Sequence, residues 1–469
     1  MTAGTVEEER MAAEEYDVIV IGAGPTGENV ADRARRGGLT AVIVESELVG
    51  GECSYWACMP SKALLRPVAA AAESAAVRGV SGARLDVAEV LKRRNSFAHD
   101  WKDDGQVSWV DGEKIDLVRG HGRLAGERLV SVGDVTLHAR HAVAIATGTG
   151  AFVPPSLAGV RPWTSREATS AQQVPGRLAV VGGGVVGCEM AAAWSALGSR
   201  VTLISRGGLL DRVPAFAGEL VAAGLRDAGV HVRTGVNVAA ASRADGDGPV
   251  TLTLDDGTVV EADEVLAAVG RTPKTADLGL ETVGLEPGSW LPVDDTLRVT
   301  AVGGGWLYAA GDVNHLALLT HMGKYQARVC GDAIAARAAG REPSVRDLAS
   351  RQWVPQVVFT LPEVAAVGLT AEQARDAGCR VRVVEYEIGD VAGARLFADD
   401  YRGRAQLVVD EDRQVVVGLT LAGPGVGEMI HAATVAVAGE VPLSRLWHAV
   451  PSYPTMSELW LRLLEAYGL

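Results

Sequence analysis

The sequence predicts an α/β protein with two doubly wound, three-layer (ββα) domains on parallel sheets and a C-terminal part of α+β type. Two observations indicate the α/β domains. An apolar strand pattern runs directly into a glycine-rich turn and a helix at residues 16–45, and the same pattern recurs at 178–206. The third observation is the change after residue 351, where strands such as 406–409 alternate with a helix around 427–439. The 469 residues suffice for about three domains of ~150 residues each.

Composition excludes several classes of partner. The chain has 44 basic and 58 acidic residues, a formal net charge of −14, which argues against nucleic acid or an anionic membrane as main partner. Apolar runs are short and broken by glycine or charge, so no transmembrane helix is predicted. Residues 1–15 are acidic and lack the basic region and apolar core of a secretory signal. We therefore expect a disordered, solvated tail at 1–15 and a cytoplasmic protein.

The first strand–turn–helix segment has the full pattern of a dinucleotide-binding site. The strand at 16–21 runs into Gly-Ala-Gly-Pro-Thr-Gly at 22–27, a helical pattern follows, and a second strand at 41–44 ends in Glu45. The helix amino terminus supplies partial positive charge for phosphates, and Glu45 can accept hydrogen bonds from an adenosine ribose. The alternative is a glycine-rich turn without a ligand, which the complete spacing disfavours.

Each glycine of this turn has a distinct predicted role. Gly22 permits the tight turn, Gly24 lets the backbone approach a pyrophosphate, and Gly27 lets the helix pack closely on the strand. Pro25 lies in the same turn and joins these glycines among the candidate cofactor-binding residues.

The second segment repeats the pattern with one informative difference. A strand and glycine turn at 178–187 precede a helix and a second strand at 200–205. No carboxylate stands where Glu45 stood; Arg206 follows the strand, and Arg212 comes shortly after. Because an acid repels a 2′-phosphate and arginines attract it, we expect NADPH here rather than NADH. Solvated surface charge is the alternative explanation of the arginines. The glycines are Gly182, Gly184 and Gly187.

Two dinucleotide sites in one chain predict FAD in one and a nicotinamide cofactor in the other.

Two cysteines follow the first site closely. In a regular helix Cys53 and Cys58 would be displaced by ~7.5 Å along the axis, whereas a disulfide needs Cα atoms within about 7 Å. The segment must be distorted, or Cys53 must precede the helix; Gly50 and Gly51 make distortion easy. Since Pro60 is tolerated only in a first turn, we expect regular helix to begin near Cys58, where a thiolate is stabilised.

The remaining cysteines, Cys188, Cys330 and Cys379, are expected to be buried small apolar residues. Five sparse cysteines are not a secreted disulfide framework. A zinc site is the rival chemistry for the close pair, but no CxxC or HxxxH partner supplies the two further ligands, so no metal is predicted. A pair of structural thiols is the other alternative.

At this point the chain resembles the pyridine-nucleotide-disulfide oxidoreductases of the glutathione reductase, dihydrolipoyl dehydrogenase and mercuric reductase type, over nearly its whole length. The Gly-Gly-x-Cys-x4-Cys-x-Pro-Ser-Lys block and both glycine turns carry the resemblance. The further motifs, in the family's order, are Ala146-Thr147-Gly148, Gly270-Arg271-Thr272-Pro273, Tyr308-Ala309-Ala310-Gly311-Asp312, and Val358-Phe359-Thr360 with Pro362-Glu363.

The resemblance implies a redox-active disulfide between Cys53 and Cys58. Cys58 would be the thiolate that touches the flavin, and Cys53 the interchange thiol that meets the substrate. Lys62 and Glu189 match the ion pair beside the flavin ring, where the lysine charge stabilises a reduced, anionic flavin.

The resemblance also implies cofactor contacts. Asp312 would bind the FAD ribityl chain near a helix amino terminus, and Arg206 and Arg212 would hold the 2′-phosphate. The other cofactor-binding candidates are Gly51, Thr147, Gly148, Gly270, Arg271 and Gly311.

The implied organisation is an FAD domain at 16–155 and 275–345, with an NAD(P)H domain at 156–274 between its parts. Residues 351–469 would form a dimerisation domain. A homodimer is expected, in which the partner's C-terminal segment completes each active site.

One departure concerns the acid–base group. Where thiol-reducing members have His-Pro-Thr-x-x-Glu, this chain has Tyr453 and retains Glu458. A phenol titrates near ~10, which puts efficient disulfide reduction or dihydrolipoamide oxidation in doubt. Tyrosine there resembles the mercuric reductase branch, but residues 464–469 lack its cysteine pair. His448 and His431 are alternative bases, or ordinary surface or interface histidines.

Between the cysteines, Tyr55 and Trp56 are bulkier than the residues usual in the family. They either narrow the substrate approach, stack on an aromatic acceptor, or pack beneath the flavin domain. The predicted function is electron transfer from NADPH through FAD and Cys58/Cys53 to a small disulfide, thiol-reactive or soft-metal acceptor. The alternatives are a diaphorase reducing quinone or oxygen, a dihydrolipoamide dehydrogenase-like enzyme, and a non-catalytic FAD-binding scaffold.

Overall fold

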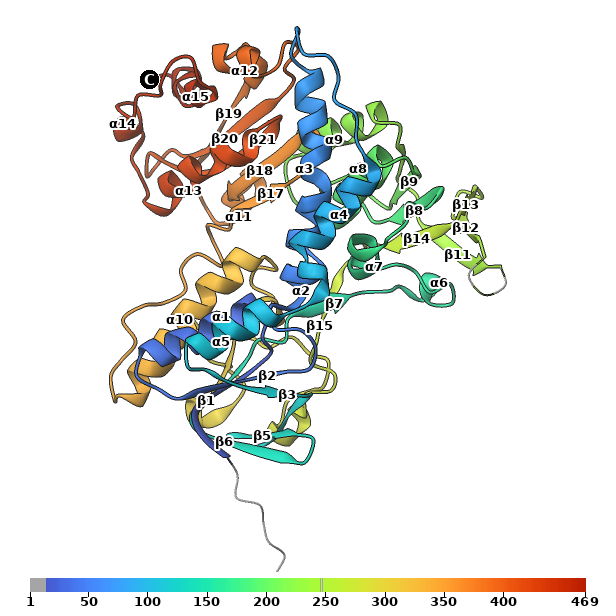
Figure 1. Cartoon of the computed structure of the whole chain (residues 1–469). Coiled ribbons are helices and arrows are strands. Elements are labelled where there is room, and N and C mark those ends of the chain that lie inside the picture. The colour runs from blue at the N-terminus through green and yellow to red at the C-terminus, as the bar shows by residue number, and fades with distance from the viewer. Residues whose placement is uncertain (1–13, 245, 247) are drawn as a thin grey trace, which may run out of the picture. The chain divides into compact units, whose positions relative to one another are not determined.

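The structure is a computed structural model that describes residues 14–244, 246 and 248–469 (Figure 1). The chain divides into two compact units, each made of three segments. The first unit holds the described residues up to Gly51, Lys102–Thr149 and Pro273–Asp347, and the second holds Glu52–Trp101, Gly150–Thr272 and Leu348–Leu469.

The first unit is built on a seven-stranded sheet of order β3-β2-β1-β6-β5-β4, with β16 also paired to β6. The central strands are parallel and read as continuous apolar runs because both faces are covered. In register, Ile21 lies between Val44 and Ile145. The strands are β1 (Glu14–Ile21), β2 (Ala41–Glu45), β3 (Asp116–Arg119), β4 (Gly122–Gly126), β5 (Leu129–Val132), β6 (Val135–Ile145) and β16 (Leu307–Ala309).

Two helices of this unit, α1 (Pro25–Arg36) and α10 (Thr320–Ala338), lie side by side (Figure 1). Their close approach depends on Gly331, where a Cβ would lie 2.5 Å from the Cβ of Arg33. Arg33 also pairs with Asp332 at 2.6 Å. This packing holds the amino ends of two helices against the carboxyl ends of the strands, where doubly wound proteins bind ligands.

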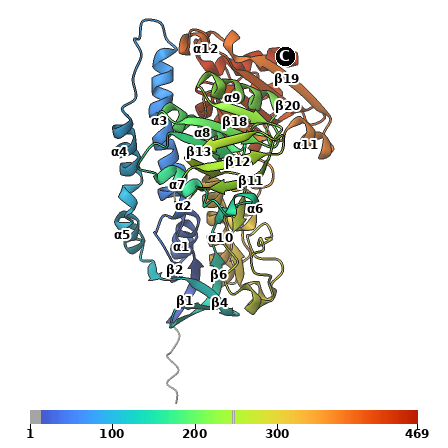
Figure 2. The ribbon, with the colours of Figure 1, turned by 90° about the vertical axis from the view of Figure 1, so that its right-hand side faces the viewer.

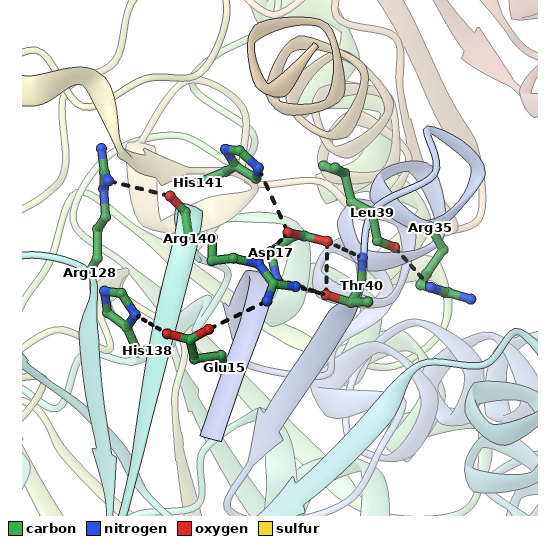
Figure 3. Close-up of polar contacts among 9 residues, drawn as sticks. All are labelled: Glu15, Asp17, Arg35, Leu39, Thr40, Arg128, His138, Arg140 and His141. Carbon is green, nitrogen blue, oxygen red and sulfur yellow. Dashed lines mark hydrogen bonds and ion pairs between the residues drawn. The ribbon is translucent and has the colours of Figure 1, made fainter. Parts of the chain in front are cut away.

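The first strand begins earlier than expected. β1 starts at Glu14, and Glu14 and Glu15 pair with Leu137 and His138 of β6. These two residues therefore belong to the sheet and not to the predicted acidic tail; its other residues, 1–13, lie outside the described residues. Figure 3 shows the polar contacts around Asp17, at the end of the sheet where β1 begins.

The second unit contains the second nucleotide-binding sheet, of order β10-β9-β8-β14 and fully parallel. A separate three-stranded antiparallel sheet supplies the β layer expected of a three-layer domain. The parallel elements are β8 (Arg177–Val181), α8 (Val185–Ala196), β9 (Arg200–Ser205), α9 (Ala215–Asp227), β10 (His231–Thr234) and β14 (Glu264–Ala267). The antiparallel strands are β11 (Val238–Arg243), β12 (Val250–Leu254) and β13 (Val259–Ala262).

The C-terminal part of this unit is a five-stranded antiparallel sheet with helices, the predicted α+β pattern. Its order is β17-β18-β21-β20-β19. The strands are β17 (Gln356–Val358), β18 (Glu363–Gly368), β19 (Val381–Glu387), β20 (Arg404–Asp410) and β21 (Val415–Gly423). The helices are α11 (Ala371–Asp376), α12 (Ala392–Phe397), α13 (Ile430–Ala438), α14 (Leu443–Leu446) and α15 (Leu459–Tyr467).

The cysteine-bearing segment also belongs to the second unit. A short helix, α2 (Gly51–Tyr55), precedes the long α3 (Cys58–Ala75), and α4 (Val87–Phe97) packs beside α3 (Figure 2). The fold class inferred from the sequence is thus confirmed, whereas the predicted domain limits stay predictions. Among the described helices none is long and apolar enough to span a bilayer.

Candidate active site and cofactor sites

The turn at 22–27 has the geometry that its glycines predict. Gly22 has φ +103°, and a Cβ there would lie 2.6 Å from the carbonyl oxygen of Ala146. A Cβ at Gly27 would lie 1.8 Å from the oxygen of Gly22. Gly24, the N-cap of α1, has no atom within 4 Å of an added Cβ. The turn therefore leaves open space in front of the helix amino terminus, as a pyrophosphate site requires.

Two neighbours complete this turn. Gly51, with φ +56°, lies against it: an added Cβ would be 2.8 Å from the Cα of Gly24. Glu45 ends β2, and its two oxygens each accept a backbone N–H at 2.7 Å, from Ala23 and Glu47. Since a carboxylate offers about four lone-pair sites, the fixed Glu45 retains acceptor capacity for ribose hydroxyls.

A second group of candidates lies at the ends of β6 and β16 in the same unit. Gly148 and Gly311 have φ +69° and +80°. Asp312 accepts a hydrogen bond from the Thr149 hydroxyl at 2.8 Å. The hydroxyl of Thr147 is buried and has no partner among the described residues. A buried hydroxyl without a partner is costly, and a polar ligand would satisfy it. These observations fit FAD.

Asp312 lies in a short 3-10 turn, Asp312–Asn314, and the helix α10 begins at Thr320. The adjoining Gly311 lies against the first turn of α1, since a Cβ there would be 2.8 Å from Thr26 Oγ1. Asp312 therefore lies near a helix amino terminus, as expected.

Glu28 is a notable residue of this unit that the sequence did not single out. It lies on α1, one turn after Gly24, and its Oε1 is buried without a partner among the described residues. Burial raises the pKa of Glu28 to about 7, against the lowering effect of Lys324. Its position one turn into an otherwise ordinary fingerprint gave no signal of burial.

The second glycine turn reproduces the first. Gly182 has φ +122° and would place a Cβ 2.2 Å from the oxygen of Ala268; a Cβ at Gly187 would lie 1.9 Å from the oxygen of Gly182. Gly184, the N-cap of α8, again has no atom within 4 Å of an added Cβ. The same local constraints therefore act twice in the chain.

Charge beyond this second turn is positive. Arg206 and Arg212 are exposed, and within the described part of the chain neither makes an ion pair. Arg271 begins the short β15 (Arg271–Pro273), and Gly270, with φ +149°, accepts a hydrogen bond from the Phe152 amide at 2.9 Å. Unneutralised guanidinium groups after β9 suit a 2′-phosphate.

The cysteine segment is broken between two helices. Cys53 lies within α2, Ala57 has φ −134° and ψ −98°, and Cys58 is the first residue of α3. Both cysteines are half-buried. The predicted helix start at Cys58 is confirmed, and of the two expected arrangements the structure has the distorted one, with Cys53 in a helix of its own. Cys58 therefore has the helix-end position that stabilises a thiolate.

One turn after Cys58, Lys62 contacts Glu189 of α8. The Nζ–Oε2 distance is 2.7 Å, and the Glu189 side chain is only 3% exposed. The other Glu189 oxygen accepts the Phe359 amide at 3.0 Å, and Lys62 lies 5.0 Å from the Phe359 ring centroid. Since residues four apart on a helix share a face, α3 presents a thiol and a fixed cation side by side.

Tyr453 and Glu458, the two candidates near the C-terminus, do not form a hydrogen bond with each other. Tyr453 is 75% exposed, whereas Glu458 is buried. Glu458 Oε1 accepts a hydrogen bond from Arg462 at 2.5 Å, and its Oε2 is buried without a partner among the described residues. His431 and His448 are both exposed. Tyr453 thus projects from the surface instead of resting on its glutamate.

The remaining candidates divide between core and surface. Cys188 and Cys330 are buried as expected, but Cys379 is partly exposed beside β19, so its expected burial was wrong. Tyr55 is fully buried, which excludes it from contact with an acceptor, while Trp56 is half-buried. Among the described residues no cluster of three His, Cys, Asp or Glu side chains could hold a metal ion.

Two dinucleotide turns, a cysteine pair at a helix start and a lysine paired with a buried glutamate define a flavin- and nicotinamide-dependent disulfide oxidoreductase. Residues 16–340 match the family described as pyridine nucleotide-disulphide oxidoreductase, and residues 354–463 match its dimerisation domain. The chain belongs to this family. It is therefore an enzyme that uses FAD and NAD(P)H, and it carries the family's dimerisation domain.

Individual relatives cover the chain almost end to end. Dihydrolipoyl dehydrogenase of Thermus scotoductus is 33% identical over 96% of this chain and 97% of its own length. Mercuric reductase of Staphylococcus aureus is 29% identical over 95% of this chain and 81% of its own. Among solved structures, the HOCl-induced flavoprotein disulfide reductase RclA of Escherichia coli has a TM-score of 0.82 and 25% identity, covering 96% of this chain and 99% of that one. LpdA of Mycobacterium tuberculosis has the same TM-score and identity, covering 97% and 100%.

Proposed function

We propose that the protein passes reducing equivalents from NADPH, through FAD and the Cys58–Cys53 disulfide, to a small thiol-reactive acceptor. The observation that carries the proposal is the placement of Cys58 and Lys62 one turn apart at the start of α3, with Lys62 held by the buried Glu189. FAD, when bound, accepts hydride from NADPH and delivers an electron pair to a disulfide.

The chain's own residues do the rest of the chemistry. Two electrons and one proton cleave the Cys53–Cys58 disulfide into a Cys53 thiol and a Cys58 thiolate, because the helix terminus and the Lys62 cation favour the charged form of Cys58. With a disulfide acceptor, Cys53 gives up its proton, attacks one acceptor sulfur and displaces the other as a thiolate, which leaves a mixed disulfide. Cys58 then attacks Cys53, re-forms the Cys53–Cys58 disulfide and releases the second acceptor thiolate. Tyr453 stands where the family has its acid–base histidine, so we propose an acceptor whose reduction does not depend on a general acid.

Soft metal ions and activated disulfides fit that requirement. Relatives named mercuric reductase support a metal acceptor, as does a mutant of RclA, 25% identical to this chain, whose structure was solved as a Cu(II) complex. NADPH is supported by the exposed Arg206 and Arg212. A homodimer is supported by the family's dimerisation domain and by exposed apolar side chains there. These side chains are Val435, Trp447, Val450 and Tyr453.

The second candidate is a diaphorase that reduces quinone or oxygen directly from FAD, favoured by the loss of the histidine at Tyr453. Alkylation of the NADPH-reduced enzyme separates the two. We expect alkylation to abolish reduction of disulfides and soft metals. Retention of the main NADPH-dependent activity after complete alkylation would support the diaphorase instead.

A further inference from the structure

The segment that carries both cysteines is held by an ion pair of its own. Glu52, immediately before Cys53, accepts two hydrogen bonds from Arg166 of α7 (Ser165–Ser170): Nε–Oε1 is 2.8 Å and Nη2–Oε1 is 2.5 Å. The same guanidinium lies 4.2 Å from the ring centroid of Trp56, between the two cysteines. A guanidinium that donates twice to one carboxylate oxygen and also lies over an indole ring is restricted to one orientation.

Side chains from elsewhere also satisfy the backbone at the break between α2 and α3. The carbonyl of Tyr55 accepts Trp101 Nε1–H at 3.1 Å, and the carbonyl of Trp56 accepts the Thr169 hydroxyl at 3.0 Å. Because the helix is interrupted here, these carbonyls need partners outside it. Thr169 lies on the same short helix as Arg166, so α7 contacts the break through two side chains.

A fully buried arginine, Arg94, holds α7 in place. Arg94 of α4 is 0% exposed and donates to the carbonyls of Thr169 and Ala171, the latter at 2.8 Å. Its guanidinium carbon lies 5.5 Å from the Trp101 ring centroid. A buried arginine is uncommon, and this one joins α4 to the carboxyl end of α7. The Glu52–Arg166 pair therefore sits on a braced element and not on a mobile loop.

We infer that Glu52 and Arg166 are a positioning pair that sets the thiolate stability of Cys53 by balancing charge one residue away. The inference rests on the proposed role of Cys53 and Cys58 as the redox couple. In this role the two residues act through the local charge and the orientation of Trp56. With both present the pair is neutral, and the side chains are 22% and 30% exposed, so solvent screens their field only in part.

The inference predicts shifts of opposite sign. Arg166→Gln removes a positive charge near Cys53 and keeps the negative charge of Glu52, which disfavours the thiolate. Glu52→Gln leaves a guanidinium still stacked on Trp56, which favours it. The double variant restores neutrality. If the pair only holds the segment in place, both single variants should loosen the segment and shift the apparent pKa of Cys53 in the same direction.

The test measures the pH dependence of iodoacetamide alkylation of Cys53 in the NADPH-reduced full-length protein. We expect the apparent pKa to rise by about half a unit to one unit in Arg166→Gln, to fall by a similar amount in Glu52→Gln, and to return close to wild type in the double variant. Arg166→Lys keeps the charge and should lie nearer wild type than Arg166→Gln. Arg233→Gln, which breaks an exposed pair with Asp256 in the same unit, serves as control.

Shifts of the same sign in both single variants, or none in either, overturn the inference. Failure of the proposed function looks different: wild-type protein would gain no thiols on reduction with NADPH, whatever the variants do. Should Arg166→Gln not fold, the comparison of Glu52→Gln with wild type and the double variant still decides the sign.

Discussion

Lys62 Nζ lies 2.7 Å from Glu189 Oε2, and the glutamate's other oxygen is taken by a backbone amide. Both oxygens of a nearly buried carboxylate are thereby satisfied, while Lys62 keeps about a third of its side chain exposed. The pair fixes a positive charge on the face of α3 that carries Cys58. We expect the pair to matter more for this fixed positive charge than for the stability of the fold.

Replacing Lys62 tests that charge. In Lys62→Met we expect the pKa of the Cys58 thiol to rise by about one unit, because the cation that favours the thiolate is gone. Global stability should fall by about 2 kcal/mol, since Glu189 is left charged and buried. The pH titration of the thiolate–flavin charge-transfer absorbance and urea denaturation measure the two effects. Lys92→Met, which breaks an exposed pair with Glu89, is the control and should change neither.

The cofactor preference depends on the two exposed arginines after β9. In the Arg206→Gln/Arg212→Gln variant we expect KM for NADPH to rise about 30-fold or more, since each charge-assisted contact with a phosphate is worth roughly tenfold. KM for NADH should stay within about twofold. Steady-state kinetics with both nucleotides measure this, with Arg226→Gln on α9 as an exposed control. Equal effects on NADPH and NADH would show that the arginines do not read the 2′-phosphate.

Asp17, near the start of β1, accepts hydrogen bonds from Arg140 and Thr40 that depend on the charge of its carboxylate (Figure 3). Its carboxylate accepts Arg140 Nε at 2.8 Å and the amide and hydroxyl of Thr40 at 2.8 and 2.9 Å. Partial burial raises the pKa of Asp17, but the hydrogen bonds from Arg140 and Thr40 outweigh burial and lower it to about 2. A depressed carboxyl pKa stabilises the fold above the unfolded value near 3.8 and ceases to do so as pH falls toward 2.

We therefore expect Asp17→Asn to be less stable than wild type by about 1 kcal/mol at pH 7, with a gap that closes between about pH 4 and pH 2. Denaturation midpoints of both proteins across this range measure it. Asp134→Asn, at an exposed turn, should follow wild type at every pH. A gap that is independent of pH would mean that the carboxylate's charge has no part in the hydrogen bonds with Arg140 and Thr40.

Glu28 should behave in the opposite sense. Burial raises its pKa to about 7 from an ordinary value of 4.5, so its contribution to stability is present below pH 4.5 and is lost as pH rises through 7. Glu28→Gln should match wild type near pH 4.5 and become more stable by about 2 kcal/mol at pH 8. Melting temperatures of the two FAD-loaded proteins at these pH values give the difference. Equal melting temperatures at pH 8 would contradict the raised pKa.

The parts predicted from sequence are those set by local constraint. Gly27 is required by the carbonyl oxygen of Gly22, which belongs to the same turn, so the spacing alone reveals it. Pro60 indicated the start of α3 because proline is favoured in a first turn, although this helix also contains Pro67 in its interior. The Lys62–Glu189 pair, by contrast, joins residues 127 apart, and only the family resemblance pointed to it.

The contacts that brace the cysteine segment gave no sequence signal. Arg166 meets Glu52 across 114 residues, and Arg94 is fully buried although arginine is a residue expected at the surface. Tyr55 faces the core and Trp56 only partly so, a distinction that composition between two cysteines does not reveal. These contacts and degrees of burial depend on packing between residues far apart in the chain, so local sequence patterns do not predict them.

The most direct test of the central claim is an anaerobic titration of the purified flavoprotein with NADPH, counting the electrons taken up. We predict an uptake of four electrons per subunit, with a long-wavelength thiolate-to-flavin absorbance at the two-electron stage that is lost in Cys58→Ser. Uptake of two electrons with simple flavin bleaching would contradict it, because the Cys53–Cys58 pair would then take no part in electron transfer.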